Sequence, residues 1–172
     1  MNDNIFIHED DYCQIQILPF ENLEFIHSQM EEIFGFRNEN FNENGVEKIY
    51  VRKNPNFPLI SKKISCKDLE SLILHSKFEK IKNVNIGYGN TYINSKNFGF
   101  GTEKCAILFE CEENKVKTIW LKFYWIATDN EKENLTKLLI EFGEIWNLIL
   151  VDWNQCVVVE LTEENLNKYL NE

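Results

Sequence analysis

Two pairs of apolar, β-branched segments constrain the fold of this chain more than any other feature. One pair occupies 104–111 and 116–125, the other occupies 148–151 and 156–161, and a short, mostly polar connection joins the members of each pair. Connections of this length join antiparallel neighbours, so each pair predicts a β-hairpin. An amphipathic pattern over 128–143 separates the two pairs and predicts a helix. Hairpins that alternate with helices indicate a mainly antiparallel sheet covered by helices.

The helix over 128–143 has clear signals at both ends. Thr128 and Glu131 have the spacing of a capping box, and Gly143 is a typical C-terminal stop. Between these ends, four apolar residues recur at helical spacing: Leu135, Leu138, Leu139 and Phe142. Such a stripe predicts that one face of the helix is buried against the sheet.

The remaining segments show weaker patterns of the same two kinds. Strands are predicted over 12–18, 46–52 and 81–88, helices over 19–34, 65–78 and 162–170, and a polar loop over 37–45. Gly35 is the predicted stop of the first helix. Residues 116–125 are apolar on both faces, with Trp120 on one and Trp125 on the other, which predicts a central strand. Together these patterns predict a single α+β domain over 1–172, with about six strands and four helices.

Composition and cysteine usage predict a cytoplasmic protein without a membrane segment. The chain has no run of about 18 apolar residues, and its first residues lack the basic and apolar regions of a signal peptide. Five cysteines occur without any Cys-x-x-Cys pair, at Cys13, Cys66, Cys105, Cys111 and Cys156. The number is odd and four of the five lie in predicted strands or at their ends, which indicates buried free thiols and suits a reducing compartment.

The net charge of −10 is concentrated at the amino end of the chain. Residues 1–47 contain eleven acidic residues and one basic residue, whereas 48–82 contain nine basic and three acidic residues. An acidic amino-terminal segment argues against nucleic acid or an anionic membrane as a partner and suits a basic protein. The simpler interpretation is a solvated acidic surface. The basic segment fits an acidic partner or, more simply, neutralisation of the protein's own acids.

No motif of an enzyme or a metal site is present in the sequence. His8, His27 and His75 lack the i, i+4 partners of helical zinc sites. Acidic residues follow His8, but a chain terminus seldom holds ligands rigidly enough for a cation. Cys66 opens a predicted helix, yet His75 lies about 13 Å further along that helix, so the two cannot form a nucleophile–base pair. We therefore predict no catalytic residues, no metal and no cofactor.

The segment 87–101 is rich in glycine and aromatic residues. It contains two bare Gly-x-Gly fragments, and neither leads into a predicted helix, so neither predicts a phosphate loop. We expect a flexible loop that carries four aromatic side chains: Tyr88, Tyr92, Phe98 and Phe100. As an alternative function, this loop would cover a pocket in a small-ligand or regulatory binding domain.

The C-terminal part combines three features: a helix ending at Phe142-Gly143, paired apolar segments from Trp146 to Leu161, and a short final helix ending at Tyr169-Leu170. This combination resembles the tails of small immunity proteins from bacterial polymorphic-toxin and contact-dependent growth inhibition systems. The resemblance covers residues 142–170 only. It implies a cytoplasmic protein without catalysis that binds and neutralises one cognate toxin domain.

The resemblance and the charge distribution together give a specific hypothesis. An acidic surface would bind a basic toxin domain, such as a nuclease, and electrostatic attraction would speed the association. The candidate partner-binding residues are Glu24, Glu31 and Glu32 on the first helix and Glu39 and Glu43 in the loop after it. The hypothesis requires that these side chains lie together on the surface and are not cancelled by lysines from the middle of the chain. An enzyme whose site is assembled from dispersed residues is a third alternative.

Overall fold

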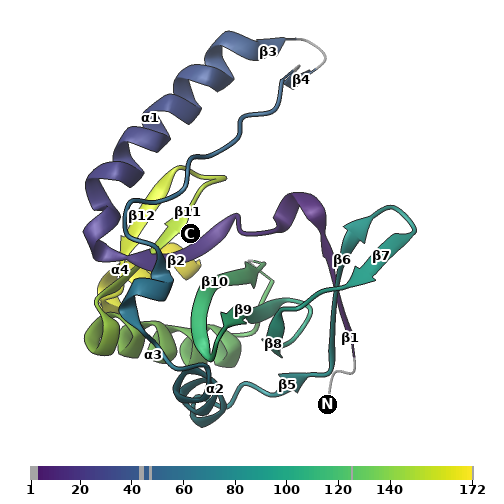
Figure 1. Cartoon of the computed structure of the whole chain (residues 1–172), viewed down its shortest axis with the longest axis vertical. Coiled ribbons are helices and arrows are strands. Elements are labelled where there is room, and N and C mark those ends of the chain that lie inside the picture. The colour runs from purple at the N-terminus through teal and green to yellow at the C-terminus, as the bar shows by residue number, and fades with distance from the viewer. Residues whose placement is uncertain (1–3, 43–44, 47, 125, 172) are drawn as a thin grey trace.

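The central sheet has seven strands in the order β12-β11-β2-β10-β9-β8-β5, and every neighbouring pair is antiparallel (Figure 1). The computed structural model describes residues 4–42, 45–46, 48–124 and 126–171. The strands of this sheet are β2 (Ile15–Pro19), β5 (Lys80–Ile81), β8 (Phe98–Gly101), β9 (Cys105–Glu112), β10 (Lys115–Phe123), β11 (Leu148–Asp152) and β12 (Val157–Glu160). The two predicted hairpins are confirmed as β9–β10 and β11–β12, and β2 lies between them.

Three of the four α-helices in the described part of the chain cover one face of this sheet. The helices are α1 (Leu23–Asn40), α2 (Cys66–His75), α3 (Asp129–Trp146) and α4 (Glu163–Asn171), with 3-10 turns at Glu9–Asp11, Phe20–Asn22 and Leu59–Lys62. Leu69 of α2, Leu138 of α3 and Leu166 of α4 are fully buried in one core with Ile107 and Ile119 of the sheet. This arrangement confirms the predicted α+β fold class.

Strand β10 is buried on both faces, as its sequence predicts. Ile119 and Leu121 face the main core, whereas Trp120 faces a second cluster on the other side of the sheet. That second cluster contains Ile5 and Ile7, so the amino-terminal residues cover this face. Trp125, which was expected at the end of the strand, lies outside the described residues.

A smaller three-stranded sheet covers the second cluster. It includes part of the segment 87–101, so the prediction of a flexible loop there is wrong. It consists of β1 (Asn4–His8), β6 (Asn83–Tyr88) and β7 (Thr91–Asn94), with β1 parallel and β7 antiparallel to β6. Residues 98–101 form β8 of the central sheet. The segment is therefore mostly strand rather than a flexible loop. Gly87 allows close strand packing, since a Cβ there would lie 1.9 Å from the carbonyl oxygen of Thr91, whereas Gly89 adopts the positive φ of 58° in the turn between β6 and β7.

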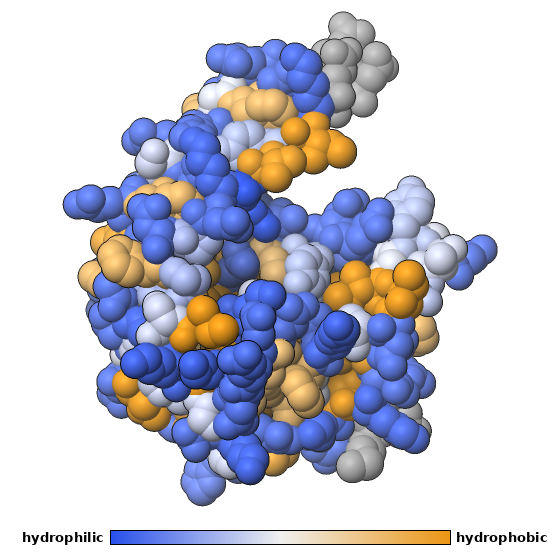
Figure 2. All heavy atoms as spheres, viewed as in Figure 1, coloured by the Kyte–Doolittle hydropathy of each residue, from blue (hydrophilic) through white to orange (hydrophobic). Residues whose placement is uncertain are grey.

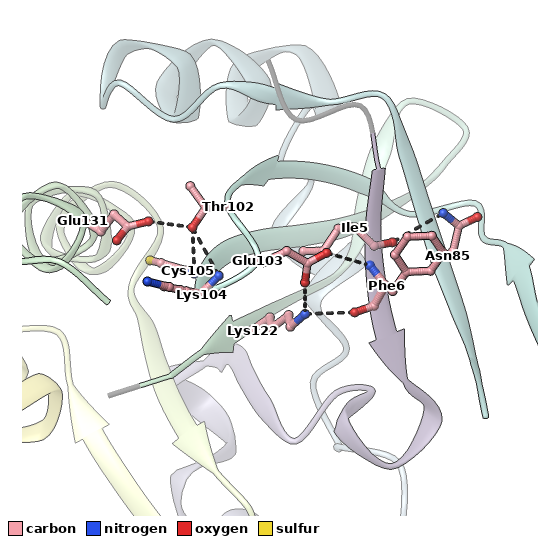
Figure 3. Close-up of polar contacts among 9 residues, drawn as sticks. All are labelled: Ile5, Phe6, Asn85, Thr102, Glu103, Lys104, Cys105, Lys122 and Glu131. Carbon is pink, nitrogen blue, oxygen red and sulfur yellow. Dashed lines mark hydrogen bonds and ion pairs between the residues drawn. The ribbon is translucent and has the colours of Figure 1, made fainter. Parts of the chain in front are cut away.

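A buried lysine ties the small sheet to the central one (Figure 3). The Lys122 side chain on β10 is 6% exposed, and its Nζ donates to the carbonyl of Phe6 at 2.9 Å and to Glu103 Oε2 at 2.5 Å. The other oxygen of Glu103 accepts the backbone N–H of Phe6 at 3.1 Å. Lys122 and Glu103 thus satisfy both backbone polar groups of Phe6 and hold β1 in place.

We expect Glu103→Ala to lower the free energy of unfolding more than Lys122→Met. Without Glu103, the buried ammonium keeps one carbonyl partner, and an unbalanced buried charge costs about 3–5 kcal/mol. Methionine fills the volume of the lysine without a charge, and the half-exposed Glu103 can then be solvated, so about 1–2 kcal/mol is lost. Urea unfolding measures both values. Equal losses, or a larger loss for Lys122→Met, would contradict this account of the pair.

Three predicted boundaries are wrong. Helix α1 continues through Gly35 to Asn40, and α3 continues through Gly143 to Trp146. The strand expected over 46–52 is reduced to β4 (Gly45–Val46), which pairs with β3 (Phe41–Asn42). Residues 48–55 form no strand; the N–H of Lys53 donates to Gln29 Oε1 of α1 at 3.0 Å instead of to a neighbouring strand.

The prediction of five free thiols is also wrong. A disulfide joins Cys66, at the start of α2, to Cys111, near the end of β9, with the two Cα atoms 6.3 Å apart. Cys13, Cys105 and Cys156 remain free. Burial raises the pKa of Cys13 to about 11 and that of Cys105 to about 12, so both of these thiols are protonated and unreactive at neutral pH.

Candidate functional site

Helix α1 projects from the central sheet as an arm (Figure 1). We use "the arm" for α1 together with the segment 48–57, which returns along it toward the sheet. The base of α1 is anchored by Ile26, Met30 and Ile33, which are buried against Ile149 and Val151 of β11. Burial of three apolar side chains fixes this end of the helix to the sheet and leaves its far end unsupported by the core.

Polar contacts fasten the returning segment to α1. Glu32 accepts hydrogen bonds from Lys53 Nζ at 2.8 Å and from the hydroxyl of Tyr50 at 2.8 Å. Asn22 exchanges two bonds with the backbone of Phe57, at 2.8 and 2.9 Å. The ammonium of Lys53 is the main cause that lowers the pKa of Glu32, so this carboxylate stays ionised and its charge is balanced within the arm.

The acidic residues proposed from the sequence divide into two kinds. Glu32 is paired with Lys53. This pairing goes against the hypothesis, which required that lysines from the middle of the chain leave the acidic residues unpaired. Glu24, Glu31 and Glu39 are exposed on α1, and the described residues offer no cation paired with any of them. Glu43 lies outside the described residues. Part of the acidic surface is therefore displayed and part is neutralised.

The basic middle segment divides in the same way. Lys53 neutralises Glu32, and Lys62 pairs with Glu21 at 2.7 Å, as the simpler interpretation of this segment predicts. Arg52 and Lys48 do not fit this interpretation. Both line a cavity at the base of the arm, and within the described chain neither is paired with a carboxylate.

The arm also exposes apolar side chains that the sequence patterns did not single out. Ile49 is 90% exposed and Val51 is 80% exposed, and Phe34 and Phe57 are more than half exposed. Apolar atoms gather on the side of the arm that faces the open hollow between the arm and the β6–β7 hairpin (Figure 2). Clustered apolar side chains on a projecting element are typical of interaction surfaces.

The cavity at the base of the arm has a volume of about 510 Å³. It lies between α1, the returning segment and the turn after β11, and its charged and polar lining consists of Gln14, Arg37, Lys48, Arg52 and Asn154. Phe36, Tyr50 and Trp153 supply its aromatic lining, and the rings of Phe36 and Tyr50 are 5.3 Å apart. Cationic and aromatic groups thus line the same cavity in a protein whose net charge is negative.

The aromatic residues of the alternative hypothesis do not converge on a pocket. Phe100 is fully buried in the main core and stacks on Phe109, and Phe98 stacks on the same ring. Tyr88 and Tyr92 are exposed on the small sheet, where they contact His8 and Phe6 respectively. None of the four lines the cavity at the base of the arm.

Where the structure describes the chain, its histidines and acidic clusters do not assemble a metal site. His8 Nδ1 accepts the backbone N–H of Asp10, and this contact caps a 3-10 turn. Within residues 4–42, 45–46, 48–124 and 126–171, no three His, Cys, Asp or Glu side chains converge as metal ligands would. No helix among the same residues combines the length and the apolar character needed to cross a bilayer.

No protein-family model, curated protein or solved structure matches this chain.

Proposed function

We propose that this protein is a binding module that engages a protein partner through the arm. The observation that carries the proposal is the display of Ile49 and Val51, 90% and 80% exposed, on an element that projects from the central sheet. Leaving two branched apolar side chains in water forgoes burial worth roughly 1.5–3 kcal/mol each. A partner that covers them gains this energy on binding.

The partner we propose is the one that the C-terminal resemblance implies, a cognate toxin domain that this protein would neutralise as an immunity protein. Glu24, Glu31 and Glu39 support a basic partner, because they place negative charge along the same helix. Glu32 does not belong to this surface, because it binds Lys53 and Tyr50. For such a role we expect the protein in the cytoplasm, where the reducing environment would convert the Cys66–Cys111 disulfide to two thiols.

The experiment is co-expression with the C-terminal domain of a large secreted protein encoded beside this gene. We expect this chain to restore growth to cells that produce the domain and to bind it directly. Ile49→Asp combined with Val51→Asp should weaken binding about 100-fold, because each change buries a charge at an apolar contact. The matched control is Ile93→Asp on β7, whose side chain is 71% exposed outside the arm.

A second measurement separates the contribution of charge to binding from that of the apolar contact. Glu24→Lys and Glu31→Lys should lower the association rate constant at low salt by about tenfold and leave dissociation nearly unchanged. Wild-type binding by the arm variant would contradict the proposed surface. Absence of rescue by the wild-type chain would contradict the toxin-neutralising role but not partner binding as such.

A further inference from the structure

The geometry points to the cavity at the base of the arm as a binding site for an oxyanion, the carboxylate or phosphate group of a ligand. Three cationic side chains converge on this cavity, and no described carboxylate balances them.

The only two arginines of the chain, Arg37 and Arg52, both line this cavity, and Lys48 is the third cation there. They come from α1 and from the returning segment. Both arginines contact Trp153, since Arg37 donates to its carbonyl at 3.5 Å and the guanidinium of Arg52 lies 5.0 Å from its ring centroid. Arginine suits oxyanions because its planar fork of N–H groups can bind two oxygens at once.

Arg52 is held in a fixed position before any ligand arrives. Its guanidinium donates to Gln14 Oε1 at 3.3 Å and to the carbonyl of Cys13 at 3.0 Å, and it stacks on Trp153. The indole N–H of Trp153 is itself bonded to Gln16 at 2.8 Å. These contacts use two of the five guanidinium N–H groups, so donors remain for a ligand. A preorganised donor loses little entropy on binding.

The partial burial of Arg52 makes an anion favourable at this place. Loss of water around the guanidinium lowers its pKa, and no carboxylate among the described residues forms an ion pair with it. Arg37 is likewise bonded to neutral groups, the carbonyls of Trp153 and Asn154. By contrast, Lys53 of the returning segment and Lys62 of the 3-10 turn that follows it have glutamate partners. Two guanidinium groups beside one residue repel each other, and a bound anion offsets this repulsion.

Nuclear magnetic resonance of the arginine side chains tests the inference directly. The chain has two arginines, so the spectrum contains two Nε–H signals, and Arg37→Gln assigns them. We expect both signals to shift with saturation when inorganic phosphate or sodium acetate is added to the wild-type protein. The anion that saturates at the lower concentration identifies the oxyanion as phosphate or carboxylate. Sodium chloride at matched ionic strength should produce neither saturating shift.

Variants decide whether the cavity is the site. Arg37→Gln and Lys48→Gln should each weaken the binding of the preferred anion, by about tenfold for Arg37→Gln, because a charge-assisted hydrogen bond is lost. These positions are chosen because Arg52→Gln would also remove bonds to Gln14 and Cys13 that support the fold. Lys67→Gln is the matched control, since Lys67 is exposed at the start of α2 and does not line the cavity. Wild-type affinity in both cavity variants, or shifts that chloride reproduces, would overturn the inference.

Discussion

Reduction of the Cys66–Cys111 disulfide is expected to lower the free energy of unfolding by about 4 kcal/mol, the loop-entropy value for a closed loop of this length. The bridge spans 45 residues of sequence, which include all of α2, β5, β6, β7 and β8. It therefore restricts more than a quarter of the unfolded chain. In the folded protein the start of α2 is also held to the β9–β10 turn by a hydrogen bond from the N–H of Cys66 to the carbonyl of Asn114 at 3.1 Å. Reduction should thus destabilise the fold without changing it.

Urea unfolding with and without a thiol reductant measures this difference. A variant with Cys66→Ser and Cys111→Ser should match the reduced wild type and should not respond to the reductant. Cys156→Ser is the control, because Cys156 is a free thiol that the reductant leaves unchanged. Thiol titration of the denatured, unreduced protein should find three free thiols. Five thiols in that titration would show that the bridge does not form.

Trp120→Ala is expected to cost about 3–5 kcal/mol of unfolding free energy, the range for removal of a fully buried tryptophan. Trp120 is 0% exposed and lies where the central sheet meets the small sheet. Its ring packs edge-on against Tyr12 at 5.1 Å, and its indole N–H donates to Asn97 Oδ1 at 3.0 Å. The alanine variant loses this packing and leaves the buried Asn97 oxygen without its donor. Chemical denaturation measures the loss.

Trp120→Phe separates the two contributions. Phenylalanine keeps an aromatic ring but not the N–H, so the expected cost falls to about 1–3 kcal/mol, mainly for the unsatisfied oxygen of Asn97. Ile93→Ala on β7 is the control and should change stability by less than about 0.5 kcal/mol, since its side chain is 71% exposed. A loss below 1 kcal/mol for Trp120→Ala would mean that the second cluster does not contribute to stability as its burial implies.

Local signals in the sequence predicted elements well where caps and periodicity agreed. The capping box of Thr128 and Glu131 is present as predicted, and the stripe of α3 is buried. Glycine was misleading in both helices where it was interpreted as a stop. A Cβ at Gly35 would meet nothing within 4 Å, so α1 passes through it freely. At Gly143 a Cβ would lie 3.0 Å from the Cβ of Leu161, so this glycine serves close packing instead of termination.

The candidate site was less predictable because it depends on contacts between distant segments. Arg37, Arg52 and Trp153 belong to three separate stretches of the chain, and no local pattern indicates that they meet. The pairing of Lys53 with Glu32 has the same origin, and it removes one residue from the acidic surface. Net charge by segment showed that opposite charges were available. It could not show which lysines would be balanced and which arginines would not.

The position of β2 in the central sheet means that its pairing depends on strands that are synthesised much later. β2 is the first strand of that sheet to leave the ribosome, yet both of its neighbours, β10 and β11, are encoded after residue 114. Until they emerge, β2 has no strand to pair with in the central sheet, and unpaired apolar strands invite aggregation. Truncated products that stop before β10 should therefore depend on chaperones or be degraded.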